Sequence, residues 1–178
     1  MGSLVSHDYD PDALHAAEAQ IARRLSGSTA DIEVQRAISN IYRAATVVSR
    51  RAEREMLDGL GLSWSAFVSL WVLWVWGEMD ATRLASEVGL TPGTVTGVRK
   101  GLEKDGLIAS RRDSDDGRKV LIRLTEHGEQ VFDDFYPKFN EWSVDIFADL
   151  SPSSTSELAD LLEHVIVRPA ADRQPPTG

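Results

Sequence analysis

The spacing of apolar residues changes once between positions 80 and 124, and this change limits the folds open to the chain. Residues 80–88 and 91–105 have helical spacing and are joined by a short turn that contains glycine. Two alternating, strand-like runs follow at 107–112 and 119–124, and the Asp-Gly pair between them is a strong hairpin signal. Two helices joined by a glycine turn predict a helix-turn-helix, and the hairpin follows it directly.

Further helices are expected on both sides of this unit. Before it, apolar spacing predicts a short helix from Asp10 to Leu25 and a long helix from Asp31 to Asp58. A third helix, from Ser63 to Gly77, is apolar nearly all round and is therefore expected to be buried. After the unit, one helix is expected over 125–146 and another from 151 onward. The predicted fold class is mainly α with a small β-hairpin wing.

The charge of the chain is unevenly distributed. With 28 acidic and 19 basic residues, the 178-residue chain has a net charge of −9, which by itself argues against a nucleic-acid partner. Residues 83–123, however, contain nine basic and six acidic side chains and are net +3, so the remainder is −12. Because the basic segment coincides with the predicted helix-turn-helix and hairpin, the local charge favours DNA.

The helix predicted over 91–105 has one side suited to DNA. On a helical wheel Val95, Val98 and Leu102, together with Thr91, share the side expected to be buried. The opposite side has lysines, threonines and glycines but no carboxylate, as expected for a helix that enters a major groove. The candidate DNA contacts on this helix are Thr91, Gly93, Thr94, Thr96, Gly97, Arg99, Lys100 and Lys104.

An ordinary solvated face is the alternative interpretation of this helix. It does not explain Gly93, Gly97 and Gly101, because each glycine costs roughly 0.8–1 kcal/mol in a helix relative to alanine. We hypothesise that the bare surface at Gly93 and Gly97 lets the helix approach DNA closely.

The hairpin adds a second set of candidate DNA contacts. Arg118, near the tip, has a long charged side chain that suits a minor groove, and basic residues at the strand ends suit phosphates. Alternatively, Arg118 pairs with Asp115 or Asp116 to order the turn. The candidate contacts in the wing are Arg111, Arg112, Asp116, Arg118 and Lys119.

The ordered motifs of this region resemble the MarR family of bacterial transcription regulators. They are Thr-Val-Thr at 94–96, Leu-Glu-Lys-Asp-Gly-Leu at 102–107, Asp116-Gly-Arg118, and Leu-Thr-Glu-His-Gly at 124–128. The resemblance covers about 31–167 and implies a winged helix-turn-helix in a homodimer. Such a homodimer is expected to bind a pseudo-palindromic double-stranded operator and to be released by a small ligand. Gly97 and Lys100 depart from the residues frequent in the family, so the operator sequence cannot be taken from relatives.

The sequence predicts how the chain is divided into functional segments. Two terminal helical regions have apolar stripes that would face water in a monomer, and this favours dimerisation. The expected segments are an N-terminal extension with a short helix (1–30), a dimerisation helix (31–62), the DNA-binding domain (63–124), C-terminal dimerisation helices (125–168) and a disordered tail (169–178).

A site for a small aromatic or anionic effector is a further hypothesis. Four of the five tryptophans, Trp64, Trp71, Trp74 and Trp76, lie in the helix expected over 63–77. Core filling accounts for Trp71 and Trp74, while the wall of a pocket for a planar ligand is the alternative. An arginine stripe on the preceding helix, which includes Arg36 and Arg43, is either a solvated face or a carboxylate partner. The candidate effector residues are Arg50, Arg54, Trp64, Trp71 and Trp76.

Several other classes of function are disfavoured. Without cysteine there is no disulfide, thiolate metal site or thiol sensor, and the four histidines lack ligand spacing, so no metal or other cofactor is expected. No catalytic motif indicates an enzyme. No signal or membrane segment is evident, since the longest apolar stretch falls short of ~20 residues, and a cytoplasmic protein is expected. The main competing hypothesis is a winged-helix protein-interaction module without specific DNA binding.

Overall fold

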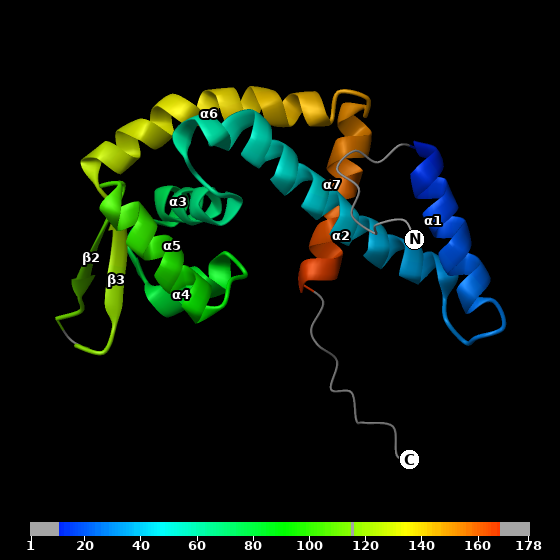
Figure 1. Ribbon diagram of the computed structural model, residues 1–178, viewed down its shortest axis with the longest axis horizontal. Coiled ribbons are helices and arrows are strands. Elements are labelled where there is room, and N and C mark those ends of the chain that lie inside the picture. Colours follow the sequence, from blue (N-terminus) through cyan, green and yellow to red (C-terminus); the bar gives the residue numbers. More distant parts are fainter. Residues whose placement is uncertain (1–10, 115, 168–178) are drawn as a thin grey trace, which may run out of the picture. The chain divides into compact units, whose positions relative to one another are not determined.

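The computed structural model describes residues 11–114 and 116–167, and the chain forms two compact units, 1–132 and 133–178 (Figure 1). Asp10, where the short N-terminal helix is expected to begin, and the expected disordered tail lie outside the described residues. The first unit contains, in order, α1 (Pro11–Leu25), α2 (Ile32–Ala52), the π-helical turn η1 (Glu53–Leu57), the 3-10 turn η2 (Asp58–Leu60), α3 (Trp64–Trp76), β1 (Met79–Asp80), α4 (Ala81–Glu87), α5 (Pro92–Lys104), β2 (Ile108–Arg112), β3 (Val120–Leu124) and the start of α6 (Glu126–Ile146).

Side-chain caps begin the two helices of the helix-turn-helix. The Asp80 carboxylate accepts hydrogen bonds from the backbone N–H groups of Thr82 and Arg83 at the start of α4. Gly89 has a φ of +65°, which glycine adopts without strain, and it turns the chain from α4 toward α5. Thr91 then caps α5 by accepting from the Thr94 N–H at 3.2 Å. The predicted helix-turn-helix is therefore present.

The wing is a three-stranded antiparallel sheet in the order β1-β3-β2. Ile108 of β2 lies opposite Leu124 of β3, as the predicted hairpin requires. The third strand, β1, is not predictable from alternation because two residues show no period; its Met79 lies opposite Ile122. The fold is mainly α with a small antiparallel sheet, which confirms the predicted class.

The core of the first unit lies where α3, α4 and α5 pack together with β3. Its most deeply buried side chains include Phe67, Leu70, Leu84, Val95 and Ile122, each at most 2% exposed. These residues come from four elements that are separate in sequence, so their burial fixes which face each helix presents to solvent.

Helix α3 is not buried all round, so that prediction is wrong for the chain by itself. The neighbouring elements cover only one face of this 13-residue helix. Its buried residues are Ala66, Phe67, Ser69, Leu70, Val72 and Leu73, whereas Trp71, Trp74, Val75 and Trp76 are exposed. Composition alone could not show this division, because both faces are equally apolar.

The α-helix predicted from Asp31 to Asp58 ends earlier, at Ala52, and continues as the π-helical turn η1. Ala52 and Leu57 are both fully buried although they are five residues apart, a spacing that matches a π-turn better than an α-helix. The Glu53 carboxylate accepts a hydrogen bond from the Trp64 N–H at 2.8 Å, which links this turn to the start of α3. Because the apolar spacing continues through residues 53–57, the sequence predicted an α-helix that is too long.

The arginine stripe of α2 is not a uniformly solvated face. Arg43 is only 8% exposed and lines a groove against α1, whereas Val34, Ile38 and Ile41 on the apolar side are exposed. The reason is that α1 packs against the arginine side of α2, which the apolar pattern of α2 does not reveal.

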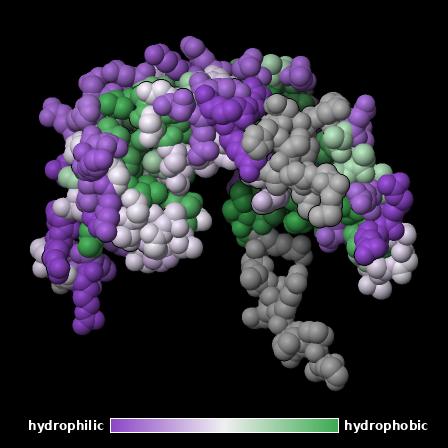
Figure 2. Space-filling model, in the orientation of Figure 1, coloured by the Kyte–Doolittle hydropathy of each residue, from purple (hydrophilic) through white to green (hydrophobic). Residues whose placement is uncertain are grey.

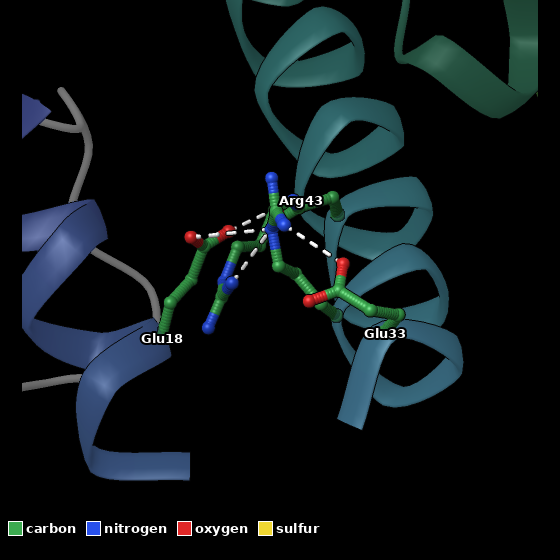
Figure 3. Close-up of polar contacts among 5 residues, drawn as sticks. Glu18, Glu33 and Arg43 are labelled. Carbon is green, nitrogen blue, oxygen red and sulfur yellow. Dashed lines mark hydrogen bonds and ion pairs between the residues drawn. The ribbon is translucent and has the colours of Figure 1, made fainter. Parts of the chain in front are cut away.

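A polar network joins α1 to this side of α2. Glu18 of α1 lies 3.5 Å from Arg36 and accepts a hydrogen bond from the Asn40 amide at 2.9 Å (Figure 3). Arg36 also donates to Glu33 at 2.8 Å, and Arg43 donates to the Asn40 amide oxygen at 3.1 Å. The carboxylates of Glu18 and Glu33 therefore balance the two arginines of this groove.

A tight joint connects the wing to α6. The Thr125 hydroxyl donates to the Gly106 carbonyl at 2.6 Å and accepts from the Gly128 N–H at 2.9 Å, while the Thr125 N–H donates to the Leu107 carbonyl. A Cβ at Gly128 would lie 1.9 Å from the Leu107 oxygen. The Leu-Thr-Glu-His-Gly motif is thus explained by packing, since only glycine permits this approach.

The second unit contains most of α6 and α7 (Pro152–Val167). Along α6 the ring of Phe139 contacts those of Phe135 and Trp142, with centroids 5.9 and 5.3 Å away. None of the α7 residues is buried, and its exposed apolar side chains are Leu158, Leu161, Val165, Ile166 and Val167. The apolar stripe predicted on this helix therefore faces solvent in the single chain.

Within the described residues no single helix is both long and apolar enough to cross a membrane. The bent pair Ile32–Leu60 and Trp64–Trp76 meets the length and composition requirement only when its two parts are taken together.

Candidate nucleic-acid interface

The buried side of α5 directs its opposite side to solvent. Val95 and Leu102 are each 2% exposed and anchor the helix in the core. Thr91, which the wheel grouped with them, is exposed and serves as the N-cap instead. The exposed Thr96 hydroxyl donates to the Pro92 carbonyl at 2.9 Å and can still accept a hydrogen bond. The predicted contacts Thr91, Gly93, Thr94, Thr96, Gly97, Lys100 and Lys104 are all exposed.

The glycines of α5 are not required by packing inside the chain. A Cβ at Gly97 or Gly101 would meet nothing within 4 Å, and one at Gly93 would meet only the Thr91 hydroxyl at 3.9 Å. None of the three has a positive φ. Alanine would therefore fit at these positions and favour the helix, so nothing in the free chain accounts for glycine there.

The basic residues of α5 differ in their partners. Lys100 and Lys104 are exposed, and in the part of the chain that the structure describes neither forms an ion pair. Arg99 is instead half-buried; it donates to Glu103 at 2.7 Å and to the Ser110 hydroxyl of β2 at 3.3 Å. Arg99 thus joins the helix to the wing, while the two lysines keep their charge available to phosphates.

Two arginines at the base of the wing already have partners. Arg111 donates to both carboxylate oxygens of Glu78, with Nε 3.0 Å from Oε1, and Arg112 donates to the Gly117 carbonyl at 3.2 Å. The Arg111 guanidinium lowers the pKa of the Glu78 carboxyl by hydrogen bonding, and the carboxylate raises the pKa of Arg111. Glu78 is not among the residues predicted from the sequence, because pairing with a residue 33 positions away has no local signal.

The tip of the wing is ordered by backbone bonds. The Asp116 carboxylate accepts from the Arg118 N–H at 3.1 Å, and the Lys119 N–H donates to the Asp116 carbonyl at 2.8 Å. Asp116 therefore orders the turn through the main chain of Arg118, not through its guanidinium. Among the described residues no acidic side chain pairs with that guanidinium, and Asp115 lies outside them. Both Arg118 and Lys119 are exposed.

The surface of this region reflects its composition. In Figure 2 the wing at the lower left is hydrophilic, and the neighbouring surface over α4 and α5 is nearly colourless, as glycine and threonine are. The hairpin has charged side chains, and the neighbouring face of α5 has small, weakly polar ones. This arrangement is complementary to duplex DNA, in which a groove lies between two charged backbones.

The candidate effector residues do not gather into one site. Trp64 is half-buried and packs on Phe67 with ring centroids 5.5 Å apart, whereas Trp71 and Trp76 are exposed. Trp64 and Trp76 lie at opposite ends of α3, about 18 Å apart along its axis. On α2 and η1, Arg50 is half-buried and Arg54 is exposed and 3.5 Å from Glu55. Among the described residues no three His, Asp or Glu side chains are placed to hold a metal ion.

The fold and this surface define a winged helix-turn-helix protein, and comparison with known proteins identifies its family. Residues 62–120 match the MarR family model. The uncharacterized HTH-type transcriptional regulator YwaE of Bacillus subtilis (strain 168) is 32% identical over 127 residues, which cover 71% of this chain and 74% of YwaE. The chain belongs to the MarR family of transcriptional regulators, which bind DNA and are not enzymes.

Solved structures share the fold at lower identity. The structure of MepR from S. aureus in complex with DNA has a TM-score of 0.65 at 20% identity and covers 72% of this chain and 95% of MepR. PcaV from Streptomyces coelicolor, solved with its natural ligand, has a TM-score of 0.66 at 21% identity and covers 78% of this chain and 96% of PcaV. These two likenesses concern the fold alone.

Proposed function

We propose that this protein is a homodimeric repressor that binds a pseudo-palindromic operator and is released by a small effector. The observation that carries the proposal is the exposed side of α5, where Lys100 and Lys104 have no carboxylate partner among the described residues and Gly97 has no internal packing role. Arg118 presents a further exposed cation on the adjacent wing. In this proposal α5 enters the major groove, while the wing contacts the neighbouring minor groove.

Exposed apolar residues support the homodimer. They belong to α2 and to the segment from the end of α6 to α7, and they include Val34, Ile38, Ile41, Tyr42, Val144, Phe147, Leu150, Leu161 and Val165. Exposed apolar side chains in such numbers are typical of an interface. A dimer also brings two copies of α5 to one duplex, with half-sites about 34 Å apart.

Light scattering coupled to size exclusion tests the oligomeric state. The intact chain is expected to elute with twice the mass of one chain, and Ile38→Glu, which places a charge on this surface, is expected to shift it toward the monomer. A monomeric wild-type protein would rule out the dimer.

Footprinting on the DNA upstream of the gene tests the operator. Two protected half-sites separated by about one helical turn, roughly 10 bp, are expected on a pseudo-palindromic sequence. Protection that spreads without a boundary, or a single protected half-site, would contradict the proposal. Repression is tested with a reporter gene placed behind the protected sequence, whose expression is expected to rise when the protein is absent.

The effector is proposed to be a small aromatic or anionic molecule. Trp71 and Trp76 expose apolar rings and Arg50 and Arg54 carry positive charges, and these are the proposed contacts although the single chain does not gather them into one pocket. The fold neighbour PcaV was solved with its natural ligand, which supports a ligand-responsive function for this fold. Tryptophan fluorescence titrated with a panel of aromatic acids, followed by DNA binding in their presence, tests this. Unchanged fluorescence together with unchanged DNA binding would exclude the aromatic acids.

A further inference from the structure

The first half of α5 has few polar groups left for a partner. Its exposed residues are Gly93, Thr94, Thr96 and Gly97. The two glycines have no side chain, and the Thr96 hydroxyl proton is used inside the helix, where it is donated to the Pro92 carbonyl at 2.9 Å. Thr96 therefore has only its methyl group and an acceptor oxygen to offer.

The hydroxyl groups at the start of the helix bind each other. The hydroxyl oxygens of Thr91 and Thr94 are 2.9 Å apart, so one of the two donates to the other. The Thr91 oxygen also accepts from the Thr94 N–H at 3.2 Å. With Thr96, these threonines bring methyl groups to the surface while most of their hydroxyl protons are already engaged.

The one arginine of α5 is held away from this part of the helix. Arginine bound to O6 and N7 of guanine is the commonest specific contact in a major groove. Arg99, however, is half-buried, and its Nη1 donates to Glu103 at 2.7 Å and to the Ser110 hydroxyl of β2 at 3.3 Å. Helix α5 contains no asparagine or glutamine, the side chains that pair with adenine. Lys100 and Lys104 lie in its second half, whereas the N-terminal residues of a recognition helix meet the base edges.

We propose that the first half of α5 recognises the 5-methyl groups of thymines in the operator, and not guanines. This inference rests on the DNA binding proposed above and names what the helix reads in each half-site. The thymine methyl is an apolar group in the major groove, and threonine methyls pack on it. The bare backbone at Gly93 and Gly97 leaves room for such a methyl, although nothing inside the chain requires glycine there. The lysines then meet phosphates, which position the protein without selecting a sequence.

Fluorescence anisotropy with modified duplexes tests the proposal. In the duplex protected in footprinting, each thymine is replaced in turn, at equivalent positions of both half-sites, by deoxyuridine, which lacks only the methyl group. At least one replacement is expected to weaken binding about tenfold, because it removes one apolar contact from each half-site. Replacement of guanines by 7-deazaguanine, which lacks the N7 acceptor, should leave the affinity within about twofold.

Gly97→Ala gives a second readout that a change in folding does not imitate. A methyl added to the helix takes the space of the methyl removed from the base, so Gly97→Ala should bind the sensitive deoxyuridine duplex more tightly than the thymine duplex. Gly101→Ala is the matched control. It has equally open space but lies to the side of the face centred on Gly97 and Lys100, so it should lose affinity on deoxyuridine as the wild type does.

Three results would overturn the proposal. They are unchanged binding to every deoxyuridine duplex, a loss of affinity with 7-deazaguanine in place of a loss with deoxyuridine, and a Gly97→Ala protein that responds to each deoxyuridine duplex as the wild type does. In all three the wild type still binds its unmodified duplex, so the proposed DNA-binding function stands. A wild-type protein that protects no specific DNA would overturn both.

Discussion

Replacing Gly97 by alanine should separate the stability of the free protein from its affinity for DNA. Gly97 lies in the interior of α5, and a Cβ there meets nothing within 4 Å. Alanine is therefore expected to stabilise the folded protein by about 0.8–1 kcal/mol through helix propensity alone. For a chain of this size such a gain raises the melting temperature by roughly 2–4 °C.

The same methyl group should weaken DNA binding. If the helix surface at Gly97 lies against the duplex, an added Cβ holds α5 away from the groove in both protomers, and we expect at least a tenfold loss of affinity, or about 1.4 kcal/mol. Fluorescence anisotropy with the footprinted duplex measures the affinity, and thermal unfolding measures the stability.

Gly101→Ala is the matched control for Gly97→Ala. Gly101 lies in the same helix with equally open space, but on the wheel it lies to the side of the face centred on Gly97 and Lys100. It should raise stability by a similar amount and leave DNA affinity within about twofold. A Gly97→Ala protein that is more stable and binds the duplex as tightly as the wild type would refute a close approach of α5 to DNA at this position.

Two further substitutions test the joint and the wing. Gly128→Ala places a Cβ 1.9 Å from the Leu107 oxygen, so urea unfolding should show a loss of about 1–3 kcal/mol or more; a stability equal to the wild type would contradict the packing. For Glu78 the folded-state pKa is lowered, so its pairing with Arg111 stabilises the fold above the unfolded-state pKa and is lost as the pH falls through the folded-state pKa. The urea curves of wild type and Glu78→Gln should therefore differ at pH 7 and converge in acid, and a constant difference would exclude the ion pair as the cause.

Local signals predicted where helices of both units begin. Side-chain caps at Asp31, Ser63, Thr91 and Ser151 each accept a backbone hydrogen bond where the helices begin, because capping depends only on residues a few positions apart. The Asp-Gly hairpin formed for the same reason. The division into dimerisation and DNA-binding segments and the assignment of DNA contacts stay predictions.

Features that depend on contacts between residues far apart in the chain could not be predicted from the sequence. The pairing of Arg111 with Glu78 and the burial of Arg43 under α1 need contacts across 20 or more positions, which no periodicity encodes. Helix α3 is apolar on every side, so its pattern could not show which face the core would leave open. The π-turn after Ala52 changed the register of a run that looks uniformly helical.

The salt dependence of DNA binding tests most directly whether the exposed lysines of α5 meet phosphates. The logarithm of the binding constant falls with the logarithm of salt concentration by about 0.9 for each phosphate contact. Lys104→Gln should therefore make the slope shallower by about 1.8 in a dimer, whereas Lys138→Gln on α6 should leave it unchanged. If the wild type and Lys104→Gln gave the same slope, α5 would not dock on DNA through this face.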